Sequence, residues 1–134
     1  MKRILALALG LSLATAGCSD PVAPATPTPA TPTVTDTFNG TLLILGSNTH
    51  QFTIQQIGGI RVSVTGVTPG AAVGVGVGTP SGSNCVLLQN LTAVPGPSPQ
   101  ISGTATITGT FCVSVFDVGN LVESVNYIVT VLHS

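Results

Sequence analysis

The stretch THQFTIQQIGGIRVSVT, residues 49–65, decides the fold, because apolar and polar side chains alternate along both of its halves. Successive side chains of a β-strand point to opposite faces, so the alternation predicts two strands, each with one buried and one solvated face. The glycines between the halves are a turn signal that closes the first strand. The side chains predicted to point into the core are Phe52, Ile54, Ile60, Val62 and Val64.

Similar short runs, each closed by Gly, Pro, Asn or Ser, continue along the chain. We count about eight predicted strands and no helix, which favours an all-β fold: a single antiparallel β-sandwich, similar to a jelly roll, over residues 38–134. In the run at 101–109, the parity places Ile101, Ala105 and Ile107 on the core side. The other predicted strands are the runs at 38–45, 72–78, 85–91, 111–118 and 126–133.

The composition indicates one small domain and argues against nucleic-acid binding. Of the 134 residues only 5% are charged, against roughly 25% in an ordinary soluble domain. Threonine and serine take the place of charged residues on the predicted solvent faces. Without Lys2 and Arg3 the chain carries one cation, Arg61, and four acids, so 1 − 4 gives a net charge of −3. Such a chain cannot neutralise a row of phosphates.

The N-terminus has the order of a secretory signal peptide. Lys2 and Arg3 precede an apolar run over residues 4–13, and small residues follow up to Gly17. The apolar run is too short for a permanent membrane-spanning helix, which needs about 20 such residues. We therefore expect residues 1–17 to be a signal peptide that is removed.

The sequence Thr15-Ala16-Gly17-Cys18 resembles the lipobox of bacterial lipoproteins, although that family usually has an aliphatic residue at the position of Thr15. The resemblance implies that the Cys18 thiol takes a diacylglyceryl group, that the chain is cut before this residue, and that the lipid holds the protein to a membrane. The implied location is the cell envelope outside the cytoplasm, at the outer membrane or the periplasmic face. Secretion without a lipid and an uncleaved anchor are the alternatives.

Residues 18–37 are predicted to be the lipid-bearing cysteine followed by a stalk. The segment after Cys18 reads SDPVAPATPTPATPTVTDT and holds five of the ten prolines. Proline favours the extended polyproline II conformation and prevents a packed helix. At about 3.1 Å per residue, the fully extended segment would hold the domain up to ~59 Å from the lipid.

Two cysteines, Cys85 and Cys112, remain when Cys18 is set aside. In an oxidising compartment such a pair is expected to form a structural disulfide. Phe111 and Val113 take the core side of their predicted strand, so the parity points Cys112 away from the core. We therefore expect the disulfide to lie near the surface.

Three segments of the chain share a pattern with a known family: Phe52-Thr53-Ile54, Gly109-Thr110-Phe111-Cys112-Val113-Ser114-Val115 and Tyr127-Ile128-Val129-Thr130-Val131. They resemble the bacterial pre-peptidase C-terminal domain, and the resemblance spans about residues 38–134. It implies a β-sandwich or jelly-roll module of a kind often attached to secreted proteases, with relatives that bind collagen or polysaccharide. The family often has acidic residues before its first aromatic strand, where this chain has GSNTH at 46–50, which weakens any calcium role taken from relatives.

The loop DVGNLVE holds the weak candidates for a metal site. The side-chain oxygens of Asp117, Asn120 and Glu123 suit calcium. The same residues, together with Gly119, are typical of a turn that joins two strands, and we favour the turn.

The other candidate residues do not form a recognisable catalytic motif. His50 and His133, the only imidazoles, lie near the ends of predicted strands without metal-ligand spacing or a nucleophile motif. Gly74, Gly76 and Gly78 lack the lysine and the helix of a phosphate loop, but their bare face could accept a sheet, an aromatic ring or a flat ligand. We therefore expect no enzyme and no cofactor.

The features together predict a non-catalytic, lipid-anchored module of the cell envelope with a structural or interaction role. The alternative is a module that binds a polysaccharide or an extracellular protein, with or without calcium. A binding module should expose aromatic side chains, and Phe116 is the only one that clearly departs from the core parity. That scarcity favours the structural role.

Overall fold

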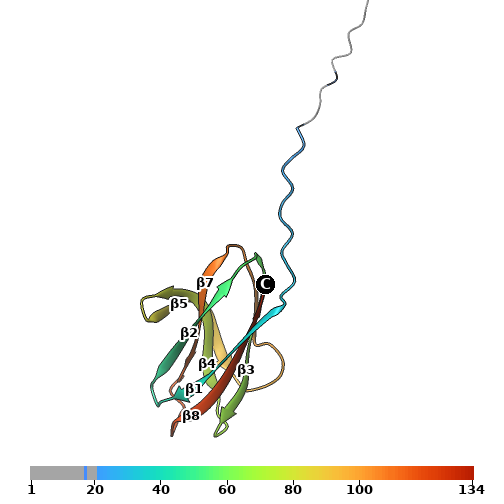
Figure 1. Ribbon diagram of the computed structural model, residues 1–134. Coiled ribbons are helices and arrows are strands. Elements are labelled where there is room, and N and C mark those ends of the chain that lie inside the picture. Colours follow the sequence, from blue (N-terminus) through green and yellow to red (C-terminus); the bar gives the residue numbers. More distant parts are fainter. Residues whose placement is uncertain (1–16, 18–20) are drawn as a thin grey trace, which may run out of the picture.

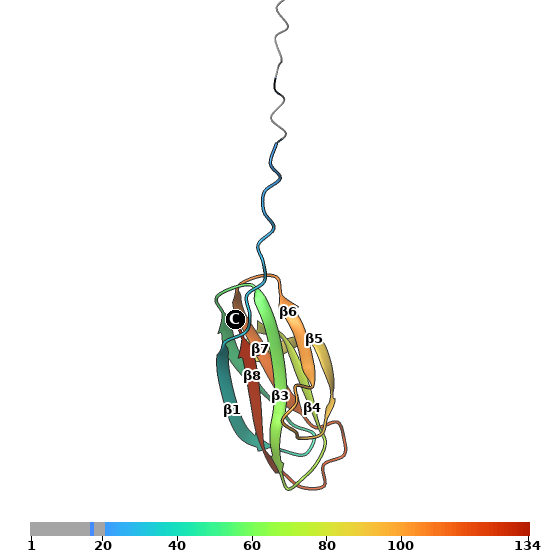
Figure 2. The same cartoon turned by 90° about the vertical axis from the view of Figure 1, so that its right-hand side faces the viewer.

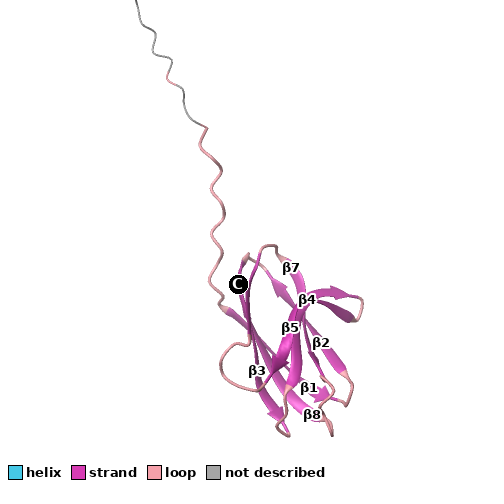
Figure 3. Ribbon diagram, turned by 180° about the vertical axis from the view of Figure 1, so that it is seen from behind, coloured by secondary structure: helices cyan, strands magenta, loops and turns pink. Residues whose placement is uncertain are grey.

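The computed structural model describes residue 17 and residues 21–134, so Cys18 and most of the predicted signal peptide lie outside the described residues. The described chain has eight strands and no helix, in two antiparallel sheets of four that pack face to face (Figures 1 and 3). The predicted all-β sandwich is confirmed. The strands are β1 (Val34–Leu42), β2 (Ser47–Ile54), β3 (Gly58–Thr68), β4 (Val73–Ser81), β5 (Asn84–Ala93), β6 (Ile101–Ala105), β7 (Gly109–Phe116) and β8 (Val125–His133).

The strand order is that of an eight-stranded jelly roll. One sheet has the order β1-β8-β3-β6, and the other has the order β2-β7-β4-β5. Only β4 and β5 are neighbours both in sequence and within one sheet. One lateral edge of the sandwich is therefore formed by β1 and β2, and the opposite edge by β6 and β5. Nothing in the described part of the chain forms a helix that could span a membrane.

The core lies between the two inner faces and follows the predicted parity. All five side chains predicted to point inward from residues 49–65 are buried. They meet fully buried valines of β7 and β8, among them Val113 and Val129. Burying a valine or leucine side chain contributes about 1.5–3 kcal/mol, so this alternation supplies the main driving force for the fold.

The first strand differs from its prediction at both ends. It was expected at 38–45, but β1 begins at Val34, inside the predicted stalk, and ends at Leu42. The Thr33 N–H donates to the His133 carbonyl oxygen at 2.9 Å, which holds the end of the stalk against β8. The apolar run after β1 has no alternation, and its residues form a turn.

One predicted core residue lies at the surface. Ile107 was expected to point inward with Ile101 and Ala105, but its side chain is 62% exposed. The reason is that β6 ends at Ala105, so the alternation of a strand no longer applies two residues later.

The domain has two poles, which Figure 2 shows at the top and bottom of the sandwich. At the stalk pole, Ala30 forms a parallel bridge with Gly58 at the start of β3. The opposite end, which we call the distal pole, carries the β1–β2, β3–β4 and β7–β8 connections. The stalk therefore joins the domain at the end farthest from these three loops.

The predicted disulfide between Cys85 and Cys112 is present, and it joins a half-buried cysteine of the edge strand β5 to a fully buried cysteine of β7. Cys112 is 0% exposed. The parity of β7 was predicted correctly, yet β7 is an inner strand of its sheet and β5 covers part of the outer face. The Leu87 side chain lies where a Cβ on Gly76 would be, and the Val86 backbone lies where a Cβ on Gly78 would be.

The glycines of β4 do accept close neighbours, as their bare face predicted. Gly74 and Phe116 lie opposite each other in the β4–β7 pairing, and the Phe116 ring fills the space of a Cβ on Gly74. Phe116 is therefore half-buried against its own sheet. Phe116, the one aromatic side chain that the sequence suggested for an exposed binding surface, therefore packs on a glycine.

Candidate functional site

His50 lies at the lateral edge formed by β1 and β2, and His133 lies on β8, the neighbour of β1 in its sheet. His50, on β2, stacks on the Phe38 ring of β1 with the ring centroids 4.8 Å apart and an interplanar angle of 11°. Its Nε2 atom shares a hydrogen bond of 2.7 Å with the hydroxyl of Tyr127. The His50 imidazole thus bridges the two sheets at their open side.

The other histidine is buried and pairs with a partly exposed carboxylate. His133 is 2% exposed, and its Nε2 atom lies 2.9 Å from Oδ2 of Asp36 on β1. Its Nδ1 atom lies 3.2 Å from the backbone oxygen of Ser134. Neither histidine pair was predicted, because the partners are 97 and 77 residues apart in sequence and no local motif joins them.

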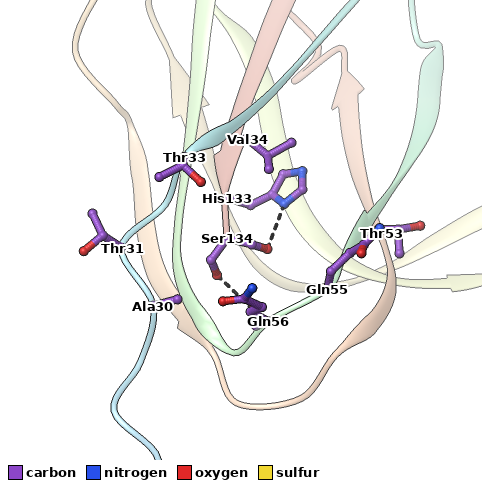
Figure 4. A pocket seen from close by; sticks show the side chains of 9 residues that line it. All are labelled: Ala30, Thr31, Thr33, Val34, Thr53, Gln55, Gln56, His133 and Ser134. Carbon is purple, nitrogen blue, oxygen red and sulfur yellow. Dashed lines mark hydrogen bonds between the residues drawn. The ribbon is translucent and has the colours of Figure 1, made fainter.

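A cavity of about 240 Å³ lies at the stalk pole, beside His133 (Figure 4). Its wall comes from the end of the stalk, the end of β2 and the end of β8, so the cavity exists only when the stalk is docked. The lining residues are Ala30, Thr31, Thr33, Val34, Thr53, Gln55, Gln56, His133 and Ser134.

The Ser134 hydroxyl and the His133 imidazole in this cavity form hydrogen bonds to separate partners. The Ser134 hydroxyl donates to the Gln56 carbonyl oxygen at 2.9 Å, and Figure 4 shows it turned away from the imidazole. Both ring nitrogens of His133 already face other oxygens, from Asp36 and from the Ser134 backbone. No hydrogen bond joins the Ser134 hydroxyl to the His133 imidazole.

Asp117 organises the loops of the distal pole. Its Oδ2 atom accepts the Leu45 N–H at 2.8 Å, and its Oδ1 atom accepts the N–H groups of Gly119, Asn120 and Leu121 at 2.8, 3.1 and 3.3 Å. The backbone hydrogen bond from Leu45, followed by those from the other three groups, holds the pKa of the Asp117 carboxyl below its ordinary value.

The three residues considered for a metal site lie in the β7–β8 connection, where Asp117 and Asn120 form hydrogen bonds with the backbone. Asn120 donates its side-chain amide to the Ala72 carbonyl oxygen at 3.2 Å, which ties the β7–β8 loop to the β3–β4 loop. Glu123 is exposed. In the described residues, no three His, Cys, Asp or Glu side chains come close enough to hold a metal ion. A calcium role for Asp117, Asn120 and Glu123 stays a prediction.

The distal pole exposes large apolar side chains. Leu43, Ile44 and Leu45 are 64%, 50% and 83% exposed, and Val118 and Val122 are 42% and 89% exposed. Among the described residues these five are almost half of the twelve exposed large apolar side chains. We call this group the distal patch.

The environment of His50 makes the stability of the domain depend on pH. Burial lowers the pKa of the His50 imidazole below its ordinary value of 6.5, because the charged form loses water. The unfolded chain then binds more protons than the folded chain at pH values between the lowered pKa and 6.5. Stability is therefore expected to fall as the pH drops through this window, and to stop falling below the folded pKa.

This dependence can be checked with His50→Gln, which replaces the imidazole by an amide that does not titrate and can still form a hydrogen bond with the Tyr127 hydroxyl. We expect the drop in melting temperature between pH 7.5 and pH 5 to be smaller for the variant than for the wild type. The range stays above the pH at which the Asp117 carboxyl titrates, so that group does not interfere. Equal drops in the two proteins would contradict the assignment.

No protein-family model matches this sequence, and no curated protein is detectably similar to it. The function must therefore be argued from the residues and their geometry. The features that bear on it are the stalk, the two poles and the exposed side chains of the distal pole.

Proposed function

We propose that this chain is a lipid-anchored, non-catalytic module of the cell envelope that holds an interaction surface away from its membrane. The observation that carries the proposal is that the two ends of the domain differ. The stalk joins the sandwich at one pole, and the distal patch lies at the other. A lipid on Cys18 would thus place the membrane behind the domain and leave the distal patch facing outward.

Two further features support a location outside the cytoplasm. The disulfide between Cys85 and Cys112 is of a type that persists in oxidising compartments. The N-terminal segment has the residue order of a lipoprotein signal peptide. The strand pattern and the jelly-roll order also support a relation to the pre-peptidase C-terminal domain.

The candidate ligand classes differ in the surface that they require. Polysaccharide binding commonly relies on exposed aromatic rings, whereas Phe116 packs on Gly74 and Tyr127 is 1% exposed. Exposed aliphatic side chains on the distal loops suit a protein ligand better. The chemistry of the stalk-pole cavity supports the absence of catalysis in the proposal, because its hydroxyl and its imidazole are turned to other partners.

The anchor is tested by Cys18→Ala in the full chain, with Ser19→Ala as a matched control. Cells that make the protein are extracted with a detergent that separates on warming, and the two phases are compared. The wild type and Ser19→Ala are expected in the detergent phase at the size of the cleaved chain. Cys18→Ala is expected to stay uncleaved or to be released in the aqueous phase. A Cys18→Ala protein that is cleaved and still partitions into detergent would overturn the anchor.

A further inference from the structure

We propose that the distal patch is a docking site for a protein that presents an apolar groove with a basic rim. The outward direction of the patch rests on the proposed function, but the binding itself does not require the lipid. The patch consists of Leu43, Ile44 and Leu45 from the β1–β2 loop with Val118 and Val122 from the β7–β8 loop. Contiguous exposed apolar patches mark interaction sites more often than isolated apolar residues do.

Hydrogen bonds join the two loops of the patch. Asp117 accepts the Leu45 N–H at 2.8 Å, and its own N–H donates to the Gly46 carbonyl oxygen at 3.0 Å. The β1–β2 loop closes on itself through the Gly46 N–H and the Leu43 carbonyl oxygen at 2.9 Å. A surface that is ordered before binding loses less conformational entropy when the partner arrives.

The backbone of Leu45 gives an independent reason to assign a function. Its φ is 57°, in the left-handed region that glycine and asparagine adopt easily and that is unfavourable for leucine. Its side chain is 83% exposed, so packing of this side chain within the domain does not compensate for the unfavourable backbone conformation. Non-glycine residues in such conformations cluster at functional sites. The hydrogen bond from Leu45 to Asp117 holds the backbone in this conformation, and the exposed leucine side chain is left free to contact a partner.

The charges of the distal pole favour a protein over a membrane as the occupant. Its charged side chains are Asp117 and Glu123, both acidic, and Arg61, the one cation among the described residues, lies near the start of β3 at the stalk pole. Peripheral membrane binding usually combines apolar residues with basic side chains or interfacial aromatic residues, and the patch has neither. A second copy of this chain docked on the patch would bring the acidic side chains of the two copies close together, which is unfavourable. A groove with basic residues at its rim complements both the aliphatic centre and the acidic border.

The test places a photoreactive amino acid at Leu45 or at Val122 of the full chain in the cells that make it. Thr104, exposed on β6 near the stalk pole, is the control position. Cross-links to one and the same protein from both distal positions, and not from Thr104, are expected. Failure to cross-link, equal cross-linking from Thr104, or cross-linking mainly to a second copy would each overturn the proposal.

The cross-linked protein is then purified and titrated against the full chain in detergent. Leu45→Asp and Leu45→Asn are expected to weaken binding at least ~30-fold, as for a residue at the centre of an interface. Both new side chains tolerate the left-handed backbone, so the variants should fold as well as the wild type. Thr104→Asp should change the dissociation constant by less than about twofold, and Glu123→Lys should weaken binding through the basic rim.

Vesicle flotation tests whether the distal patch binds a membrane instead of a protein. The Cys18→Ala chain is floated with vesicles of phosphatidylcholine alone and of phosphatidylcholine with phosphatidylglycerol. No flotation that depends on Leu45 is expected, and flotation lost in Leu45→Asp would overturn the protein assignment in favour of a membrane. Because cross-linking can be scored in the Cys18→Ala chain as well, failure of the lipid anchor and failure of the docking site are distinguishable.

Discussion

The double variant Cys85→Ala with Cys112→Ala is expected to lower the free energy of unfolding by about 3–4 kcal/mol. The disulfide closes a loop with a sequence separation of 27 residues, and on a chain-entropy account such a closure restricts the unfolded chain by this amount. Cys112 is also fully buried, so its truncation removes packing atoms from the outer layer of the sheet. Urea unfolding of the oxidised wild type and of the variant measures the difference.

The control for this experiment is the reductant. Wild-type protein unfolded with dithiothreitol present should approach the stability of the double variant, whereas the double variant itself should not respond to dithiothreitol. A double variant as stable as the oxidised wild type would show that the cross-link does not limit the unfolded chain. Most of the loss should appear in the midpoint of unfolding, with a change in slope only if the unfolded chain expands.

Gly78→Ala is expected to destabilise the domain by about 3 kcal/mol, near the upper end for overpacked sites. A Cβ on Gly78 would overlap the carbonyl group of Val86, which is backbone and cannot rotate away as a flexible side chain can. The β4–β5 pairing also shifts register between Val77 and Gly78, so Gly78 lies at an irregularity of the hairpin. Thermal or urea unfolding of the variant against the wild type measures the loss.

Gly103→Ala is the matched control, because it makes the same chemical change in a strand of the other sheet. A Cβ on Gly103 would meet no atom within 4 Å, and β6 is an edge strand. The variant should be neutral or slightly more stable, since alanine restricts the unfolded chain more than glycine does. Equal effects of Gly78→Ala and Gly103→Ala would mean that β5 does not cover the outer face of β4.

The two predictions concern the same outer layer, which the sequence did not reveal. The parity of β7 pointed Cys112 away from the core, and it does point there. Whether that direction leads to water depends on what covers the sheet, and the cover comes from Leu87 and its neighbours on β5. Period-two alternation describes the two faces of one strand and says nothing of a second strand folded over one of them.

The two long-range polar pairs could not be predicted from the sequence for a related reason. Asp36 lies in a segment whose prolines and threonines predicted a stalk, and nothing local shows that it reaches His133. His50 and Tyr127 are on strands of different sheets, so only the packing of the sandwich brings their side chains together. Such pairs depend on register and sheet order, which are set by the whole set of strands.

The sequence by itself determined the elements that depend on neighbouring residues. The alternation around Phe52 and Val62 predicted strands and their buried faces, because a strand exposes every second side chain to the same side. The cysteine count predicted the disulfide. Tertiary structure alone decided that Leu43–Leu45 leave the sheet as an exposed turn, that Asp117 holds this turn, and that Cys112 is covered, because each depends on contacts between segments far apart in the chain.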